Sequence, residues 1–381
     1  MNSFDRIIDR SGTGSMKWER YAGKDILPLW VADMDFATPA VVLDAVRREL
    51  DHEIMGYPVP RPSQTAAVIE WLEKKHGWKT RPEWFIWLPG VVPALHVALR
   101  AYLKPGEKAL INAPVYPPFI TAPDLSGRDY RDVPFRLKDG TWQIDAAEFA
   151  DAAKETPLHL LCSPHNPVGR VFSRAELEEM AKVWLANDMV ICSDEIHCDL
   201  VLDKKTPHIV TATLSPEIES RTVTLMAPSK TWNVPGLCTA FAIIPDAGLR
   251  LKFQRTLKGI VPDPNVLGLV ACEAAYRHGG PWLDELKDYL RGNLDYMMNF
   301  FAARLPELTI WRPEATYLAW IDCRKLGVAS PKEHFESFGV GLHEGALFNA
   351  PGYLRINFGC PRSTLVEALH RMEKAVEVKR G

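Results

Sequence analysis

Four short motifs in this sequence carry side chains whose types and order could support covalent chemistry on an amine or a carbonyl compound. The motifs are SPHNPVG at 163–169, SDEIH at 193–197, APSKTWN at 227–233 and LRINF at 354–358. They supply an amide, a carboxylate, an amine and a guanidinium, on Asn166, Asp194, Lys230 and Arg355. A lysine amine can hold an aldehyde as an imine and then move protons. A Ser-Lys pair alone is typical of a solvated surface, so the hypothesis depends on the four motifs together.

Lys230 and Asp194 are expected at the same edge of a buried sheet. Lys230 follows the strand expected at 222–226 after three residues, on a loop, and Asp194 directly follows the strand expected at 189–193. Ligands of open α/β sheets bind at this carboxyl edge. A buried carboxylate is costly without a partner, so we expect Asp194 to hold the protonated ring nitrogen of pyridoxal 5'-phosphate (PLP), unless it caps a helix or a turn. Arg355, in a strand-like run, also needs a partner, and a substrate α-carboxylate is the natural one.

Three further side chains are expected around the cofactor ring. Asn166 follows the strand expected at 158–162, and its amide could donate to the phenolic oxygen of the ring, although Asn before proline is also a common turn residue. His197 could face the same oxygen or be an ordinary packed or solvated histidine. Tyr116, just beyond the strand expected at 109–112, has the planar face needed to stack on a pyridine ring, unless it is a core aromatic.

The phosphate group of such a cofactor needs hydrogen-bond donors. A helix is expected at 93–103, with Pro93 at its first position. The amides of Val91 and Val92, at the start of this helix, are the expected donors. The hydroxyl of Ser229 could add another.

These side chains need a scaffold of alternating strands and helices. Short apolar runs recur along the chain at 109–112, 158–162, 189–193, 222–226 and 240–244. Fully apolar strands bounded by turn residues predict a mostly parallel sheet covered by helices on both faces. Ser173 and Glu176 form a capping box that opens a helix expected at 174–187. The pattern is that of an α/β, doubly wound fold.

The pattern changes after residue 280. The expected elements are a long helix, two strands and a closing helix, at 282–305, 315–321, 354–357 and 362–378. They predict a smaller α+β domain, to which the N-terminal segment is added. The expected division is a large PLP-binding domain at 48–280 and a small domain made of 1–47 and 281–381.

Composition disfavours several other classes of protein. The 381 residues carry a formal net charge of −3, so we expect no basic surface for nucleic acid or an anionic membrane. No apolar run approaches the ~20 residues that span a bilayer, and the N-terminus has no signal-peptide run. Seven cysteines without a CxxC pair indicate small buried hydrophobes in a reducing cytoplasm, not disulfides or a zinc site. We therefore expect a cytoplasmic protein without a metal, nucleic-acid or membrane partner.

With these motifs, the chain resembles the PLP-dependent enzymes of fold type I, aminotransferase class I/II. Within them it is most similar to the MalY/PatB group of cystathionine β-lyases, which are C–S lyases. The motifs specific to this group are WVADMDF at 30–36, PVYPPF at 114–119 and SDEIH at 193–197. The likeness extends over nearly the whole chain, whereas the Asn-Pro, Asp and Lys positions are shared across the superfamily.

The resemblance implies a role for each matching residue. A Schiff-base lysine, a ring-nitrogen partner, a donor to the ring oxygen and a stacking ring fall on Lys230, Asp194, Asn166 and Tyr116. Lys230, Asp194 and Tyr116 are the expected catalytic residues. Arg355 becomes the clamp for the substrate α-carboxylate, with Asn166 and Ala32 as further substrate contacts. Enzymes of this fold build their sites at a dimer interface, so the resemblance implies a homodimer in which Tyr57 reaches the neighbouring subunit's phosphate.

The chain departs from the class pattern at the expected phosphate site. Typical aminotransferases place an arginine after the Gly-Leu that follows the lysine, where this chain has Cys238, and often a serine where it has Ala227. The phosphate would then depend more on backbone amides, Ser229 and Tyr57. Loss of that arginine is familiar in the lyase-like group and favours it. Asn349 stands where a glycine is often found, near the expected substrate pocket.

Two reactions share all of these residues. A C–S β-lyase would remove the Cα proton of L-cystathionine or a related cysteine S-conjugate and expel the thiol, leaving pyruvate and ammonia. An aminotransferase would instead pass the amino group of an L-amino acid to a 2-oxo acid. The branch depends on which atom Lys230 reaches, so both stay open here, with the lyase favoured. A regulatory module without activity is disfavoured by the complete set of site residues.

Overall fold

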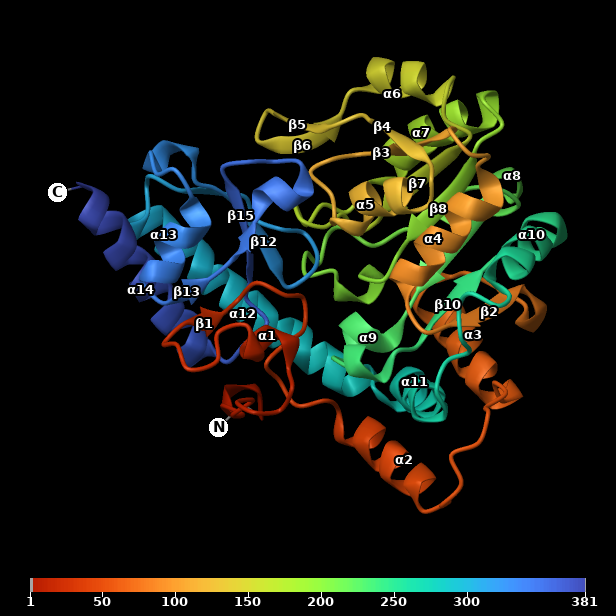
Figure 1. The fold of residues 1–381 in the computed structure, drawn as a ribbon, viewed down its shortest axis with the longest axis horizontal. Helices are drawn as coiled ribbons and strands as arrows, with labels where there is room; N and C mark the ends of the chain where they lie inside the picture. Colours follow the sequence, from red (N-terminus) through yellow and green to blue (C-terminus); the bar gives the residue numbers. More distant parts are fainter. Residues whose placement is uncertain (1–2, 381) are drawn as a thin grey trace.

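The largest sheet of the fold has seven strands and lies at the right in Figure 1. The structure, a computed structural model, describes residues 3–380. In spatial order the strands are β2 (Phe85–Leu88), β10 (Ala240–Ile243), β9 (Thr222–Met226), β8 (Val190–Asp194), β7 (Leu158–Cys162), β3 (Lys108–Ile111) and β4 (Asp129–Asp132). Of these seven, β10 alone runs antiparallel to its neighbours, so the prediction of a mostly parallel sheet is confirmed.

Helices cover both faces of this sheet because its strands are apolar on both sides. Neighbouring residues of β7 show the two faces: Leu160 and Leu161 belong to different core clusters. The helices of the first cluster are α4 (Val91–Tyr102), α5 (Pro118–Leu125) and α10 (Ala247–Leu257). Those on the opposite face are α6 (Ala146–Ala153), α7 (Arg174–Ala186) and α11 (Val266–His278). The predicted α/β fold with helices on both faces is therefore confirmed.

A second sheet lies to the left in Figure 1 and is antiparallel throughout. Its strands are β11 (Thr309–Ile310), β12 (Leu318–Asp322), β15 (Tyr353–Asn357) and β14 (His343–Glu344). The helices of this region are α12 (Gly280–Arg304), α13 (Pro331–Ser337) and α14 (Arg362–Arg380). This region is the smaller α+β part that the sequence predicted. The exact division at residues 48 and 281 stays a prediction, and residues 1–2 and 381 lie outside the described part.

The remaining elements connect the two sheets or extend from them. They are α1 (Met16–Glu19), β1 (Leu27–Pro28), α2 (Ala40–Leu50), α3 (Pro62–His76), the hairpin β5 (Phe135–Lys138) and β6 (Thr141–Ile144), α8 (Pro216–Glu219), α9 (Pro228–Thr231) and β13 (Val340–Gly341). The N-terminal segment joins the small region because β1 pairs in parallel with β13. In contrast, α2 and α3 pack on α11, and α2 lies at the outer edge of the molecule (Figure 1).

Two local predictions were wrong in detail, and a third is confirmed. Helix α4 begins at Val91, so Pro93 is its third residue and not its first. A proline is tolerated there because its missing N–H would have no acceptor in the first turn. Lys230 lies in the one-turn helix α9 and not on a loop. The capping box of Ser173 and Glu176 does open α7.

Two further findings concern the surface and the cysteines. Within residues 3–380, no helix has both the length and the apolar character needed to cross a lipid bilayer. All seven cysteines are free thiols, and all but Cys238 are buried. Six of the cysteines therefore act as small core residues, as the sequence predicted, whereas the prediction was wrong for Cys238.

Candidate active site

A pocket of about 190 Å³ opens at the carboxyl ends of β7, β8 and β9, the edge where the sequence predicted a ligand site. Its walls are formed by Ala32, Gly90, Val91, Val92, Pro93, Tyr116, Cys162, Asn166, Asp194, Ile196, His197, Ser229 and Lys230. All the predicted site residues except Arg355 and Tyr57 belong to these walls. Segments far apart in the chain thus meet at one place.

Lys230 reaches the pocket from α9, directly after β9. Its Nζ atom donates a hydrogen bond of 2.6 Å to the carbonyl of Ala32, which also accepts one of 2.9 Å from the hydroxyl of Tyr317. Burial lowers the pKa of Lys230 to about 8, although the nearby carboxylate of Asp33 opposes this shift. An appreciable fraction of the amine is therefore neutral at physiological pH.

Asp194 is the last residue of β8 and is buried in the pocket wall. Its Oδ1 atom accepts a hydrogen bond of 3.1 Å from the amide of Ile196, and no other described residue donates to it. Burial raises the pKa of Asp194 to about 7, against the opposing effects of this amide and of Lys230. A cationic donor from a ligand would stabilise such a carboxylate.

Arg355 approaches the pocket from β15 of the small sheet. Its Nη1 atom donates to Oδ1 of Asn166 at 2.9 Å, which joins it to the pocket wall. Its Nη2 atom contacts the carbonyl of Trp30 and Nδ1 of His343, both at 2.9 Å, and its buried Nε has no partner. Among the described residues no carboxylate forms an ion pair with Arg355, and burial lowers its pKa to about 10. A buried cation with neutral partners and a free donor is suited to an anionic ligand.

His197 and Tyr116 bring two rings to the pocket. His197 is buried, and its Nδ1 atom has no hydrogen-bond partner. Burial, assisted by the cations of Lys230 and Arg355, lowers the pKa of His197 to about 3, so the imidazole is neutral. The amide of Tyr116 donates to the carbonyl of Asn166 at 3.0 Å and so ties the two predicted ring contacts together. Their roles toward a cofactor stay predictions.

The N-terminus of α4 forms another part of the pocket. Gly90 precedes the helix and Val91 and Val92 are its first residues, so their amides have no acceptor within the helix. Ser229 lines the same pocket from α9. None of the lining residues is an arginine, and Cys238, where the class pattern has one, is exposed. Backbone amides therefore supply most of the donors available to an anion here.

Tyr57 does not line the pocket of its own chain. It is fully exposed, in the connection between α2 and α3. Ile54, Met55 and Val59 beside it are exposed apolar residues as well. The predicted contact of Tyr57 with a neighbouring subunit stays a prediction.

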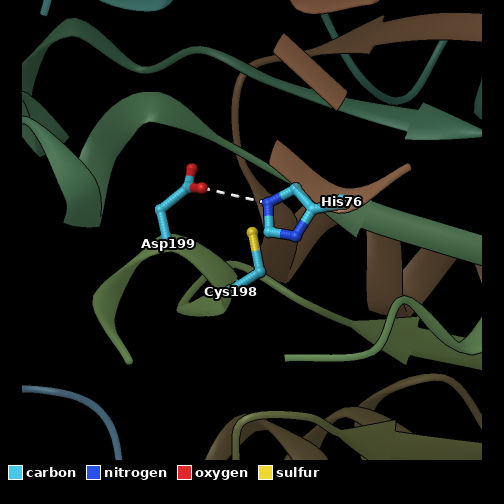
Figure 2. A group of neighbouring side chains, drawn as sticks. All are labelled: His76, Cys198 and Asp199. Atoms are coloured by element: carbon cyan, nitrogen blue, oxygen red, sulfur yellow. Dashed lines mark hydrogen bonds and ion pairs between the residues drawn. The ribbon is translucent and has the colours of Figure 1, made fainter. Parts of the chain in front are cut away.

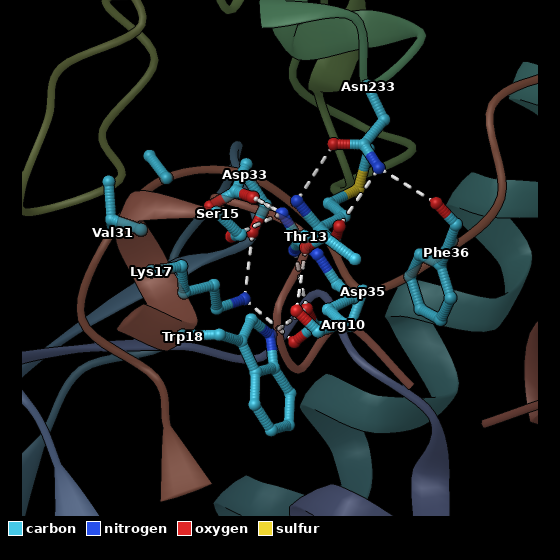
Figure 3. Close-up of polar contacts among 12 residues, drawn as sticks. Arg10, Thr13, Ser15, Lys17, Trp18, Val31, Asp33, Asp35, Phe36 and Asn233 are labelled. Atoms are coloured by element: carbon cyan, nitrogen blue, oxygen red, sulfur yellow. Dashed lines mark hydrogen bonds and ion pairs between the residues drawn. The ribbon is translucent and has the colours of Figure 1, made fainter. Parts of the chain in front are cut away.

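The segment 30–36 is held at the pocket by an ion-pair network that the sequence analysis did not predict. Lys17 is 1% exposed and donates to Oδ2 of Asp35 at 2.7 Å and to the carbonyl of Asp33 at 3.0 Å. Arg10 joins the two acids, with Nη1 2.7 Å from Asp35 and Nη2 2.7 Å from Asp33. Figure 3 shows these side chains converging from separate parts of the N-terminal segment. The network fixes the backbone that carries the Ala32 carbonyl.

Two asparagines outside the N-terminal segment form hydrogen bonds with the backbone of residues 31–36. Asn233, three residues after Lys230, accepts from the amide of Met34 at 2.9 Å and donates to two carbonyls of the segment at 2.9 and 2.8 Å (Figure 3). Asn357, at the end of β15, donates to two more at 2.7 and 2.8 Å. The WVADMDF motif at 30–36 contains Asp33 and Asp35, and the APSKTWN motif at 227–233 contains Asn233, but a single sequence does not show that the motifs touch.

A second polar cluster lies outside the pocket, on the residues after His197 (Figure 2). Asp199 is hydrogen bonded to Nε2 of His76 and accepts from Nε1 of Trp71, each at 3.0 Å, and the thiol of Cys198 lies beside them. Burial raises the pKa of Cys198 well above its usual value, so the thiol is neutral. These side chains are of the kinds that bind transition metals. Their hydrogen bonds already account for the cluster as a buried His-Asp pair, and we assign no ion to it.

Comparison with known proteins identifies the family. The model of the family described as aminotransferase class I and II matches residues 24–372. The chain belongs to this family. Cystathionine β-lyase PatB of Bacillus subtilis, which is similar to this chain, is 37% identical over 98% of this chain and 100% of PatB. The predicted resemblance to the MalY/PatB group is therefore confirmed.

Solved structures similar to this chain agree with this assignment. The crystal structure of OvoB has a TM-score of 0.95 and 44% identity to this chain and covers 98% of both chains. The PLP-bound C–S lyase from Staphylococcus hominis has a TM-score of 0.93 and 33% identity, over 99% of this chain and 98% of that one. The prediction of PLP fold type I is confirmed.

Proposed function

We propose that this protein is a PLP-dependent C–S β-lyase that acts on L-cystathionine or a related cysteine S-conjugate. The observation that carries the proposal is the likeness, nearly end to end, to PatB and to the Staphylococcus hominis C–S lyase. The reaction converts one thioether and one water molecule to a thiol, pyruvate and ammonia. It breaks the Cβ–S bond, and the sulfur leaves with the electron pair.

The pocket has the groups that PLP requires. The buried Asp194, with its raised pKa and a single amide donor, would pair with a protonated ring nitrogen. The free amides of Val91 and Val92 and the hydroxyl of Ser229 would hold the phosphate. Lys230 would bind the aldehyde carbon covalently.

Three side chains would contact the cofactor ring. The side-chain nitrogen Nδ2 of Asn166 is free of other described residues, because Oδ1 is the side-chain atom that contacts Arg355. This nitrogen would donate to the phenolic oxygen, and the neutral His197 would lie near the same atom. Tyr116 would stack on the ring.

The chain's own residues would direct the reaction at the substrate Cα. When bound, PLP supplies a protonated ring that withdraws electrons from this atom. Arg355 would hold the α-carboxylate, with its unpartnered Nε among the donors. The amine of Lys230, with a pKa of about 8, would take the Cα proton. The carbonyl of Ala32, 2.6 Å from Nζ, would keep the amine in position between steps.

The deciding assay supplies the PLP-loaded protein with L-cystathionine and follows free thiol and pyruvate together. Equal amounts of both, formed over many turnovers, would support the lyase. No thiol, but transfer of the amino group to an added 2-oxo acid, would replace the lyase by the aminotransferase. That alternative has the family model in its favour. If neither product forms, both proposals fail for this substrate.

We also propose a homodimer in which Tyr57 contacts the phosphate in the neighbouring subunit. The exposed apolar side chains around Tyr57 support it, because a connection that leaves Ile54, Met55 and Val59 in water is suited to a protein surface. Tyr57→Phe should weaken PLP affinity by about tenfold and change kcat less. Sedimentation should find a dimer, and a fully active monomer would contradict the contact.

The division at residues 48 and 281 and the cytoplasmic location are proposals of the same kind. Seven free thiols suit a reducing compartment. Limited proteolysis that cuts near residue 281 and leaves two stable fragments would support the division.

A further inference from the structure

Arg20 is an exposed cation that an aromatic ring holds in place. Its guanidinium lies 4.5 Å from the centre of the Trp30 ring and 5.6 Å from that of Tyr21. The Trp30 ring is itself fixed, because its Nε1 donates to the carbonyl of Lys17 at 3.1 Å. Among residues 3–380, no acid forms an ion pair with the Arg20 side chain. Stacking restricts the guanidinium and leaves its edge free to donate.

Trp30 and His343 connect this cation to the proposed α-carboxylate clamp, Arg355. The carbonyl of Trp30 accepts from Nη2 of Arg355 at 2.9 Å, and the same nitrogen is 2.9 Å from Nδ1 of His343. The rings of Trp30 and His343 meet edge to face at 5.8 Å. Trp30 and His343 therefore connect one buried and one exposed guanidinium. The charge of Arg20 also acts on His343. Burial, followed by the charges of Arg355 and Arg20, lowers the pKa of His343 to about 3.

Two guanidiniums that both contact Trp30, Arg20 through its ring and Arg355 through its carbonyl, suit a ligand with two carboxylates. The buried Arg355 would bind the α-carboxylate, and the exposed Arg20 has no protein anion to satisfy it. Holding the side chain against a ring in advance reduces the entropy lost on binding. An arginine in this state binds a carboxylate through two hydrogen bonds.

We propose that Arg20 binds a second carboxylate on the sulfur substituent of the substrate. The enzyme would then prefer cysteine S-conjugates whose departing thiol carries a carboxylate. This inference rests on the proposed lyase function. It adds the chemical class of the leaving group, which the residues that line the pocket do not indicate.

The test compares two inert thioethers on the PLP-loaded protein by titration calorimetry. (Carboxymethylthio)propionate and (propylthio)propionate share the carboxylate that would bind Arg355 and differ in the second one. Neither has an amino group, so neither can react. The wild-type protein should bind the dicarboxylate more tightly by about tenfold, the strength of one partly exposed charge-assisted pair.

Arg20→Met should remove this preference and leave the affinity for the propyl compound unchanged. Arg20→Lys should retain part of it, because an ammonium keeps the charge without the paired donors. Arg255→Met, an exposed arginine without an ion pair on α10, is the matched control and should behave as wild type. Equal binding of the two compounds by the wild type, or a preference that survives in Arg20→Met, would overturn the proposal.

The binding result does not depend on turnover, so the two proposals fail separately. A protein that shows the tenfold preference but releases no thiol from S-(carboxymethyl)-L-cysteine has the carboxylate site without the lyase. A protein that releases thiol equally well from this substrate and from S-propyl-L-cysteine is a lyase in which Arg20 has no such role.

Discussion

Segment 30–36 contacts one buried and one partly buried lysine, and the two have opposite surroundings. Lys17 is 1% exposed and forms an ion pair of 2.7 Å with Asp35. Lys230 finds only the carbonyl of Ala32, at 2.6 Å, and no described carboxylate pairs with it directly. The first amine has a carboxylate and a carbonyl as acceptors within the chain. The second amine has no carboxylate partner among the described residues, and burial lowers the pKa of Lys230 to about 8, so part of it is neutral and can react.

The carboxylates differ in the same way. Burial acts to raise the pKa of Asp35, but Lys17, Arg10 and Trp18 together hold it below its usual value. Asp194 has one backbone donor, and its pKa is raised to about 7. Paired buried charges fix a structure, whereas buried charges without partners are typical of sites where a ligand completes the set.

The largest effect is expected at the unpaired lysine. Lys230→Ala should abolish covalent retention of PLP and lower turnover by about 10⁴-fold or more, because the proposed base is lost. Mass spectrometry after borohydride reduction and the thiol assay measure the two results. Lys182→Ala, an exposed lysine paired with Glu179, is the control. Retained activity in Lys230→Ala would end the scheme.

Removal of the unpaired carboxylate of Asp194 should have the second-largest effect. Asp194→Ala should still bind PLP, but weakly, and turnover should fall by roughly a hundred- to a thousandfold, because nothing keeps the ring nitrogen protonated. Equilibrium dialysis with PLP and the pyruvate assay measure both quantities. Near-normal turnover would remove Asp194 from the ring nitrogen.

The paired lysine should affect stability more than chemistry. Lys17→Met leaves Asp35 buried with one cation fewer, and we expect a loss of about 3 kcal/mol in the free energy of unfolding. Urea denaturation measures this loss. The double variant Lys17→Met/Asp35→Leu should recover part of it. An unchanged midpoint for Lys17→Met would show that the pair does not hold the segment.

A smaller effect should appear in the pH dependence of the cofactor-free protein. The folded-state pKa of Asp194 is raised from 3.8 to about 7, so the unfolded chain ionises first and stability falls as pH rises between these values. Asp194→Asn lacks this loss. Its advantage over wild type should therefore grow by roughly 3 kcal/mol from pH 5 to pH 7.5, as measured by urea denaturation. Parallel stability curves would mean that Asp194 titrates normally.

The main polar residues of the pocket were predictable because each one lies at the end of a strand or shortly after it. Asp194 ends β8, Asn166 and Lys230 follow β7 and β9 after three residues, and the carboxyl ends of neighbouring strands meet at one edge. The sheet and its covering helices follow from the same runs. Position in the chain and local pattern were enough for this part of the molecule.

The support of the segment 30–36 was not predictable in this way. The contact of Asn233 with Met34 joins residues 199 positions apart, and no local periodicity reports such a pair. Lys17 looks like any surface lysine in a polar stretch until the fold buries it. The one-turn helix α9 is too short to show a helical period, so Lys230 was expected on a loop.

The wide separation of these contacts has a consequence for synthesis on the ribosome. The segment that carries Ala32 emerges early, yet its partner Asn233 follows Met34 by 199 residues and Asn357 follows Val31 by 326. At translation rates of about 5–20 residues per second, the nascent segment stays without the first partner for about 10–40 s. The large sheet is complete in the chain once β10 ends at Ile243, so it can form before Asn357 is made. The pocket therefore closes last, when the C-terminal region docks, and a nascent chain stalled before residue 357 should have its sheet but no finished site.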